Sequence, residues 1–264
     1  MCGGAWSVGD DRSDRDRIEP ISETVRRQAL ADLDRAIISL SLIDNDPSAM
    51  VRRARRRTKR VRVGVRLLRS QDKRRFRDED RILAQAVRNL GPVRDRQVAH
   101  HLIGNLGRWP GNMVPPPMAP SVRISVAHSG MILNGVRGRA GSWEISSLDD
   151  EAITAELERC YRLARRQWRS AMDDVEADGL AGCRKAVQRA ADQARITAPQ
   201  LRTSERFVAL TGLAKHLGNL LDLAPLPDSD HSRQPELERN ILDLGHEVFS
   251  LKPEEHLRWL AGPD

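Results

Sequence analysis

The chain has 264 residues, which is enough for one large domain or two moderate ones with a buried core. Lysine and arginine total 44 against 37 aspartates and glutamates, the formal charge is +7, and aromatic residues make up only 3% of the sequence. Three widely spaced cysteines exclude a disulfide scaffold and show no zinc-binding pattern, and the longest apolar run is too short to span a bilayer. We therefore expect a cytoplasmic all-α protein with no membrane partner and a core of leucine, valine, isoleucine and alanine.

Apolar spacing and turn residues divide the chain into four parts. In chain order these are a disordered tail over 1–18, a first helical half over 19–107, a linker over 108–146 and a second helical half over 147–264. Within the first half, the periodicity predicts helices over about 21–43, 47–70 and 78–90, and a fourth that starts near residue 93.

The linker lacks a clear helical pattern. Five prolines fall between residues 110 and 120, and a weak alternation of apolar residues follows over 122–126. Because Asn134-Gly135 is typical of a turn, the segment could form a small hairpin, although we favour a flexible linker.

Positive charge is concentrated in residues 51–100, which hold 18 lysines and arginines against 5 acids, a net charge of +13. Cations recur there every three or four residues and so lie along one helical face: Arg52, Arg55, Lys59, Arg62 and Arg66. Apolar residues with the same spacing form the adjacent face, which we assign to the core: Val51, Ala54, Thr58, Val61, Val65 and Leu68. No acid interrupts the basic stripe, so we expect a polyanionic partner rather than an ordinary solvated face.

A second helix with two stripes begins after a predicted N-cap at Ser147. Its apolar stripe consists of Ile153, Leu157, Tyr161, Ala164, Trp168, Met172 and Val175. Its basic stripe consists of Arg159, Arg162, Arg166 and Arg169. Two such helices suggest that their arginines face a common space.

The two helical halves share short sequence features, which indicate an internal duplication. Leu90-Gly91 precedes Asp95 as Leu217-Gly218 precedes Asp222, at an offset of 127 residues. Arg55-Arg56 corresponds to Arg184-Lys185 at an offset of 129 residues. We therefore expect two pseudo-symmetric helical bundles joined by the proline- and glycine-rich linker.

With these features the chain resembles the CHAD family, a histidine-containing α-helical domain that carries the motif V-H-x-x-R-x-x-x-K-x-x-R. The matching positions are Val51, Arg52, Arg55, Lys59 and Arg62, followed by Arg94-Asp95, by the segment around Asp222 and by the C-terminal LGHEVFSLKPEEHLRWL. The resemblance covers about residues 21–260 without the linker. The chain is a divergent member, because the signature histidine is replaced by Arg52 in the first half and by Ala181 in the second.

The resemblance implies two bundles around a basic groove that binds inorganic polyphosphate without catalysis, in association with polyphosphate granules. It places the ligand along Arg52, Arg55, Lys59, Arg62 and Arg66, with Arg56, Arg94, Arg184, Lys185 and Lys215 as further contacts. Asp95 and Asp222 are expected to orient arginines. The second-half stripe keeps only two of its five cations, so we expect the first half to dominate binding.

No residue pattern points to an enzyme, a cofactor or a metal site. The histidines lack ligand spacing, and neither a nucleophile motif nor a glycine-rich phosphate loop is present. Non-specific nucleic-acid binding stays open as an alternative, although residues 51–100 offer only Phe76 for base stacking. A scaffold that docks an acidic partner, or that self-associates, is the third possibility.

Overall fold

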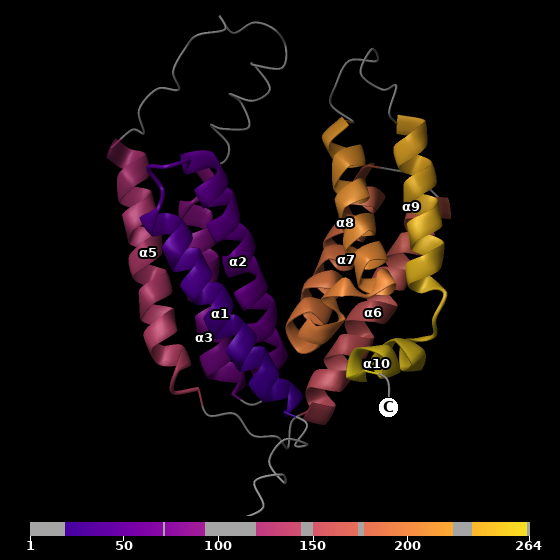
Figure 1. Ribbon diagram of the computed structural model, residues 1–264, viewed down its shortest axis with the longest axis horizontal. Helices are drawn as coiled ribbons and strands as arrows, with labels where there is room; N and C mark the ends of the chain where they lie inside the picture. The colour runs from indigo at the N-terminus through magenta and orange to yellow at the C-terminus, as the bar shows by residue number, and fades with distance from the viewer. Residues whose placement is uncertain are drawn as a thin grey trace, which may run out of the picture.

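The computed structural model describes residues 19–70, 72–92, 120–143, 150–173, 177–223 and 234–262 (Figure 1). Every regular element in these ranges is helical, which confirms the all-α class. The α-helices are α1 (Ile21–Ser41), α2 (Pro47–Leu67), α3 (Lys73–Asn89), α5 (Pro120–Ala140), α6 (Asp150–Asp173), α7 (Ala177–Thr197), α8 (Glu205–Leu223), α9 (Gln234–Phe249) and α10 (Pro253–Ala261). Among these helices, none is long and apolar enough to cross a membrane.

Helices α1, α2, α3 and α5 form a first four-helix bundle, in which α1 and α3 each pack against both α2 and α5. The side chain of Asp46 caps α2 by accepting a hydrogen bond of 2.9 Å from the backbone N–H of Ala49. Asp72 caps α3 in the same way, so that this helix begins five residues before the expected start at 78. The core positions assigned on α2 are confirmed as buried: Val51, Ala54, Thr58, Val61, Val65 and Leu68.

Helix α5 corrects the expected linker and hairpin, which are wrong for residues 120–140. Six residues that follow one another at steps of four and three form its buried face: Val122, Val126, Ser129, Leu133, Val136 and Ala140. The alternation over 122–126 therefore reflects one helical repeat, and Asn134 and Gly135 lie within the helix. Ion pairs fix α5 to its neighbours, with Arg137 2.7 Å from Asp34 on α1 and Arg139 2.8 Å from Glu79 on α3. Residues 108–119 and 144–146 of the expected linker lie outside the described residues.

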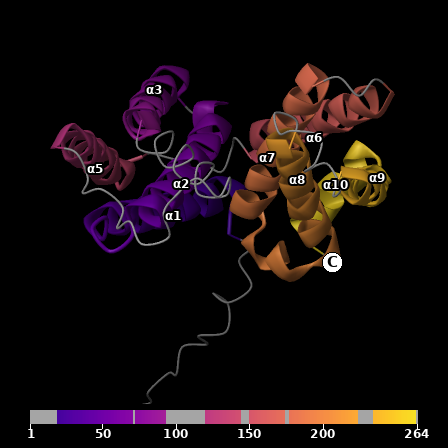
Figure 2. The same cartoon turned by 90° about the horizontal axis from the view of Figure 1, so that it is seen from above.

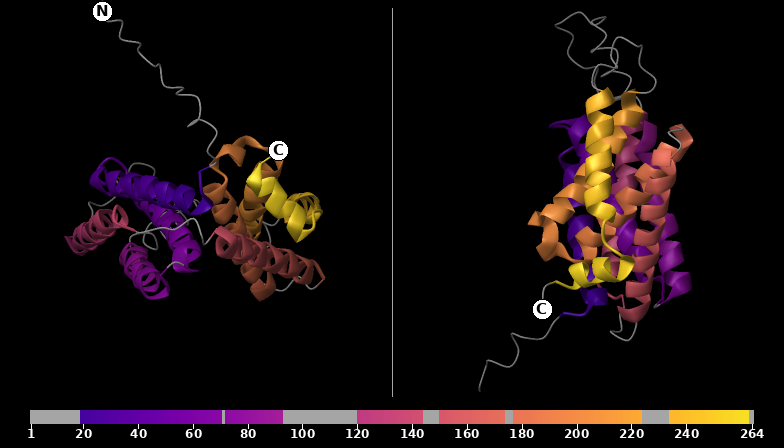
Figure 3. Two further views of the ribbon diagram at one scale, coloured as in Figure 1. Left: turned by 90° about the horizontal axis from the view of Figure 1, so that it is seen from below. Right: turned by 90° about the vertical axis from the view of Figure 1, so that its right-hand side faces the viewer.

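Helices α6, α7, α8 and α9 form the second bundle, and α10 packs on α6 (Figure 3). The expected apolar stripe of α6 is buried at Ile153, Leu157, Tyr161, Ala164 and Trp168. The predicted N-cap Ser147 lies outside the described residues, as does Val175.

An aromatic cluster holds α10 against α6. The ring of Tyr161 stacks on that of His256 with centroids 3.9 Å apart, and the Tyr161 hydroxyl lies 3.0 Å from the carbonyl oxygen of Leu251. Burial, together with the charge of Arg206, lowers the pKa of His256 to about 3. The imidazole is therefore neutral when it stacks.

The two bundles lie side by side, with α1 and α2 of the first facing α6 and α7 of the second (Figures 1 and 2). The Asp150 carboxylate at the start of α6 accepts hydrogen bonds of 2.9 and 3.1 Å from the backbone N–H groups of Ile21 and Ser22 at the start of α1. Helix α7 packs against both α1 and α2. This contact places two arginine-bearing helices, α2 and α7, on opposite sides of one boundary.

One arginine–glycine contact recurs in both bundles. The guanidinium of Arg55 lies 3.7 Å from where a Cβ on Gly91 would stand, and that of Arg184 lies 3.1 Å from the equivalent point on Gly218. These are the pairs that the sequence offsets of 129 and 127 residues relate. The internal duplication stays a prediction, and this contact is its structural counterpart.

Candidate anion-binding site

A groove of about 450 Å³ lies between the two bundles. Helix α2 contributes Lys59, Arg62 and Arg66 to it, and α7 contributes Lys185 and Arg189. The remaining lining consists of Val63, Leu163, Gln167, Gly182, Ala186, Gln188 and Asp192. Five cations and a single carboxyl group therefore line the groove, with cations on both walls.

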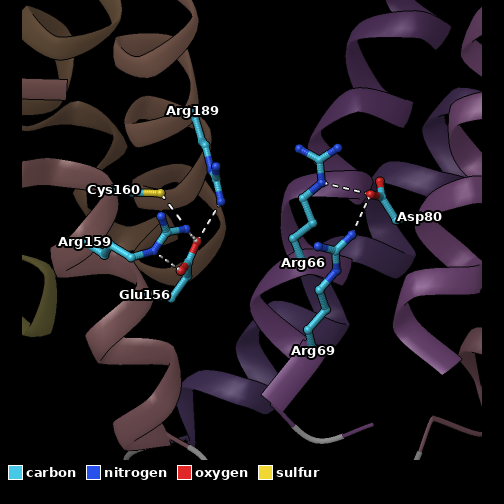
Figure 4. Close-up of polar contacts among 7 residues, drawn as sticks. All are labelled: Arg66, Arg69, Asp80, Glu156, Arg159, Cys160 and Arg189. Carbon is cyan, nitrogen blue, oxygen red and sulfur yellow. Dashed lines mark hydrogen bonds and ion pairs between the residues drawn. The ribbon is translucent and has the colours of Figure 1, made fainter. Parts of the chain in front are cut away.

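On the α2 wall, the carboxylate of Asp80 on α3 pairs with the arginines. It accepts hydrogen bonds from the Nε of Arg62 at 2.7 Å and from the Nε of Arg66 at 3.0 Å. Arg69 pairs with the same carboxylate through Nη2 at 2.8 Å (Figure 4). Arg62 and Arg66 use Nε for this contact, and among the described residues no acceptor occupies their terminal guanidinium nitrogens, which can therefore serve another acceptor.

Asp80 is 7% exposed, and burial by itself raises its pKa. The hydrogen bonds from Arg62 and Arg66, together with their charges, outweigh this effect and bring the pKa of Asp80 below its usual value. The carboxylate is thus ionised at neutral pH and orients the arginines around it.

The α7 wall has a similar support. Glu156 of α6 pairs with Arg189 at 2.6 Å and with Arg159 at 2.7 Å (Figure 4). Burial raises the pKa of Glu156. The hydrogen bond from Arg159 and the charges of Arg159 and Arg189 have a larger, opposite effect, so the pKa lies below its usual value. The Cys160 thiol also contacts this carboxylate, and burial raises the pKa of the thiol, which is therefore uncharged at neutral pH.

Asp192 of α7 is the one acidic residue in the lining of the groove. Burial raises its pKa to about 6, against the opposing effects of a hydrogen bond from Gln188 and of the charges of Arg60 and Arg195. Arg60 is itself buried, which lowers its pKa to about 10, and it lies 3.8 Å from Asp32. The charge of the groove therefore becomes more positive as the pH falls through 6.

The structure brings together part of the predicted site. Lys59, Arg62, Arg66 and Lys185 line the groove. Arg52, Arg55 and Arg56 lie nearer the start of α2, outside this lining, and Arg55 donates a hydrogen bond to the carbonyl oxygen of Val87. Arg184 lies against Gly218, and Lys215 is exposed on α8, which does not contribute to the groove.

Arg94 and Asp95 lie outside the described residues, and the side chain of Asp222 is not among those described. The orientation of arginines by Asp95 and Asp222 stays a prediction. Asp80 and Glu156, which the sequence did not single out, pair with arginines in the described residues. Arg189, also missed, follows Lys185 by four residues and so shares its helical face.

The expectation that the arginine stripes of α2 and α6 face a common space is wrong for Arg162, Arg166 and Arg169. Helix α6 contributes Leu163 and Gln167 to the groove. Arg159 precedes Leu163 by four residues on the same face of the helix and pairs with Glu156, which also pairs with the groove residue Arg189. Arg162, Arg166 and Arg169 line a separate hollow instead. The second basic wall of the groove is α7.

Within the described ranges, no group of three or more histidine, cysteine, aspartate or glutamate side chains could hold a metal ion. Searches of protein-family models, of curated proteins and of solved structures found no match to this chain. The resemblance to the CHAD family therefore stays a prediction.

Proposed function

We propose that this protein binds inorganic polyphosphate in the groove between its two bundles. The observation that carries the proposal is the set of five cations on the two groove walls, three on α2 and two on α7. Asp80 and Glu156 pair with three of these cations, Arg62, Arg66 and Arg189. A ligand therefore meets arginines whose side chains are already ordered, which reduces the entropic cost of binding.

The chemistry of the walls suits a chain of phosphates. Guanidinium groups donate paired hydrogen bonds that match phosphate oxygens, and here the acids occupy only part of each donor set. From Lys59 to Arg66 the cations cover about 10 Å of α2, and the stripe continues to Arg52 over about 21 Å in total. A linear polyanion follows such a line, because each repeat of the ligand meets another cation.

Duplex DNA fits this arrangement less well. Its phosphates lie on the outside of a stiff rod, so the duplex would reach the rims of the groove but not both walls at once. The lining also offers no aromatic side chain on which an unpaired base could stack. Nucleic-acid binding would therefore rest on charge alone and would weaken steeply with salt.

The proposal is tested by removing one cation from each wall without disturbing Asp80 or Glu156. We expect the variant Lys59→Gln/Lys185→Gln to bind long-chain polyphosphate at least about tenfold more weakly at about 0.15 M salt, as measured by isothermal titration calorimetry. Both lysines are exposed, so the far-ultraviolet circular dichroism should be unchanged.

The matched control is Lys73→Gln/Lys215→Gln, which also removes one exposed lysine from each bundle but lies outside the groove. It should bind polyphosphate as the unmodified chain does, apart from a small loss of long-range attraction. Equal weakening in the two variants would show that only the net charge matters, and the groove would then have no part in binding.

A further inference from the structure

The arginines of α6 that do not reach the groove form a second basic site. Arg162, Arg165, Arg166 and Arg169 share one face of the helix and, together with Pro253 at the start of α10, line a hollow of about 320 Å³. The groove meets α6 at Leu163 and Gln167, on a different part of its circumference. The hollow and the groove share no lining residue.

The charge of this face is only partly compensated. Arg162 pairs with Glu158 on the same helix and lies 3.8 Å from Glu254. In the described part of the chain, Arg165, Arg166 and Arg169 form no ion pair, and the Nε of Arg165 is buried without a hydrogen-bond partner. Like charges three and four residues apart repel each other and destabilise a helix. A bound anion would reduce this repulsion.

Four arginines of the first bundle contrast with these, because acids on neighbouring helices pair with them. Arg57 pairs with Asp32, and Arg62, Arg66 and Arg69 converge on Asp80. Three of these cations share the single carboxylate of Asp80, and the fourth pairs with Asp32. On α6 no neighbouring helix supplies such an acid to Arg166 or Arg169 among the residues described.

We propose that the hollow lined by Arg162, Arg165, Arg166 and Arg169 binds a compact anion of two or three linked phosphoryl groups. The four arginines extend over seven residues, or about 10 Å along the helix, which limits the ligand to a short one. The lining consists of arginine and proline, so it offers planar donor groups for phosphate oxygens but no aromatic surface for a base.

Two features at the rim of the hollow affect anion binding. The N-terminus of α10 lies at the hollow, and the partial positive charge of a helix N-terminus favours anions. Glu254 lies at the same rim and competes with the ligand for Arg162. Binding therefore depends chiefly on Arg165, Arg166 and Arg169. This inference does not require that the groove bind polyphosphate.

The test uses sodium tripolyphosphate as the probe, titrated into the full chain at about 0.15 M salt by calorimetry. We expect saturable binding that becomes at least about tenfold weaker in Arg166→Gln/Arg169→Gln. The matched control is Arg74→Gln/Arg77→Gln on α3, which removes two exposed arginines with the same spacing and should bind as the unmodified chain does. Circular dichroism checks that each variant is folded.

The groove variant Lys59→Gln/Lys185→Gln separates this inference from the proposed function. If the α6 site is real, this variant keeps its tripolyphosphate binding even where it loses long-chain polyphosphate. Loss of tripolyphosphate binding in the groove variant, with no loss in Arg166→Gln/Arg169→Gln, would overturn the inference and leave the groove proposal standing. An absence of tripolyphosphate binding by the unmodified chain would overturn it as well.

Discussion

In the first bundle Arg57, Arg62 and Arg66 of α2 pair with acids on neighbouring helices. On α6 of the second bundle, the closest ion pairs lie within the helix itself, and Arg165, Arg166 and Arg169 pair with no acid that the structure describes. Asp32 and Asp80 together hold Arg57, Arg62, Arg66 and Arg69, from helices on either side of α2. On α6, Glu156 and Glu158 reach Arg159 and Arg162 from one turn away. An arginine stripe thus has different consequences, depending on which helix packs beside it.

The bundles also differ in how their cores are filled. Among the described residues, the first packs Phe76 against Trp143, with ring centroids 5.3 Å apart. The second packs Tyr161, Trp168, Phe249 and His256 into a continuous cluster under α9 and α10. Large rings leave little room for adjustment, so the second bundle should tolerate added volume less well.

The largest expected effect tests this difference in packing. A Cβ added to Gly245 of α9 would lie 2.1 Å from the Nε1 of Trp168, whereas one added to Gly64 of α2 would lie 3.4 Å from its nearest neighbour, on Val25. We expect Gly245→Ala to lower the free energy of unfolding by about 3 kcal/mol and the melting temperature by about 10 °C. Gly64→Ala should change stability by less than about 1 kcal/mol, because the gain in helix propensity offsets the tighter packing. Similar melting temperatures for the two variants would contradict the account of the two cores.

The second-largest expected effect is on stability. It compares two acids, Asp80 beside the α2 wall and Glu156 beside the α7 wall. Asp80→Asn leaves three arginines without their shared carboxylate, and we expect a loss of about 2 kcal/mol in urea unfolding at pH 7. Glu156→Gln affects two partly exposed arginines and should cost about 1 kcal/mol. An equal loss in both variants would show that the walls are supported alike.

The pH dependence of the stability of Asp80→Asn gives a second test. The folded-state pKa of Asp80 is lowered, so its stabilising contribution is present above the unfolded-state pKa of about 3.9 and is lost as the pH falls through the lower folded-state value. The stability difference between the unmodified chain and Asp80→Asn should therefore persist from pH 7 to about pH 5 and diminish below about pH 4. A difference that stays constant down to pH 3 would show that another property of the variant, and not its charge, is responsible.

The smallest expected effect is the pH dependence of polyphosphate binding. We attribute it to Asp192, the one acid in the groove lining. Asp192 has a folded-state pKa of about 6, so it is charged at pH 7.5 and largely neutral at pH 5. We expect polyphosphate to bind about threefold more tightly at pH 5 than at pH 7.5, because the groove then lacks its negative charge. In Asp192→Asn this pH dependence should be reduced, and affinity at pH 7.5 should approach that of the unmodified chain at pH 5. An identical pH profile in the variant would exclude Asp192 as the responsible group.

The same group affects stability in a predictable direction. Because the pKa of Asp192 is raised on folding, the protein loses stability as the pH rises from about 4 through 6. Asp192→Asn should lack this loss, so its unfolding midpoint in urea relative to that of the unmodified chain should increase between pH 4 and pH 7. A relative midpoint that does not change over this range would contradict the raised pKa.

The sequence predicted the elements whose periodicity is strong. The apolar stripe of α2 identified both the helix and its buried face, as did the stripe of α6. Helix α5 was missed because glycines, serines and nearby prolines obscure its buried face, which becomes evident only where α1 and α3 cover it.

The site was predicted in part for a related reason. Spacing showed that Lys59, Arg62 and Arg66 share a face, and the groove contains all three. Spacing could not show which helix lies opposite: the stripes suggested α6, whereas the family resemblance named Lys185 of α7, which lines the second wall. Nor could it show that Asp80 faces Arg62 and Arg66, because that contact depends on the register between α2 and α3.

The most direct test of the groove proposal is a competition between long-chain polyphosphate and duplex DNA, at matched phosphate concentration, with the salt concentration raised through about 0.15 M. The account predicts that polyphosphate binding persists at this salt concentration while DNA binding collapses, and that Lys59→Gln/Lys185→Gln removes the difference. Equal, salt-sensitive binding of both polymers would contradict it and would reduce the groove to a generic basic surface.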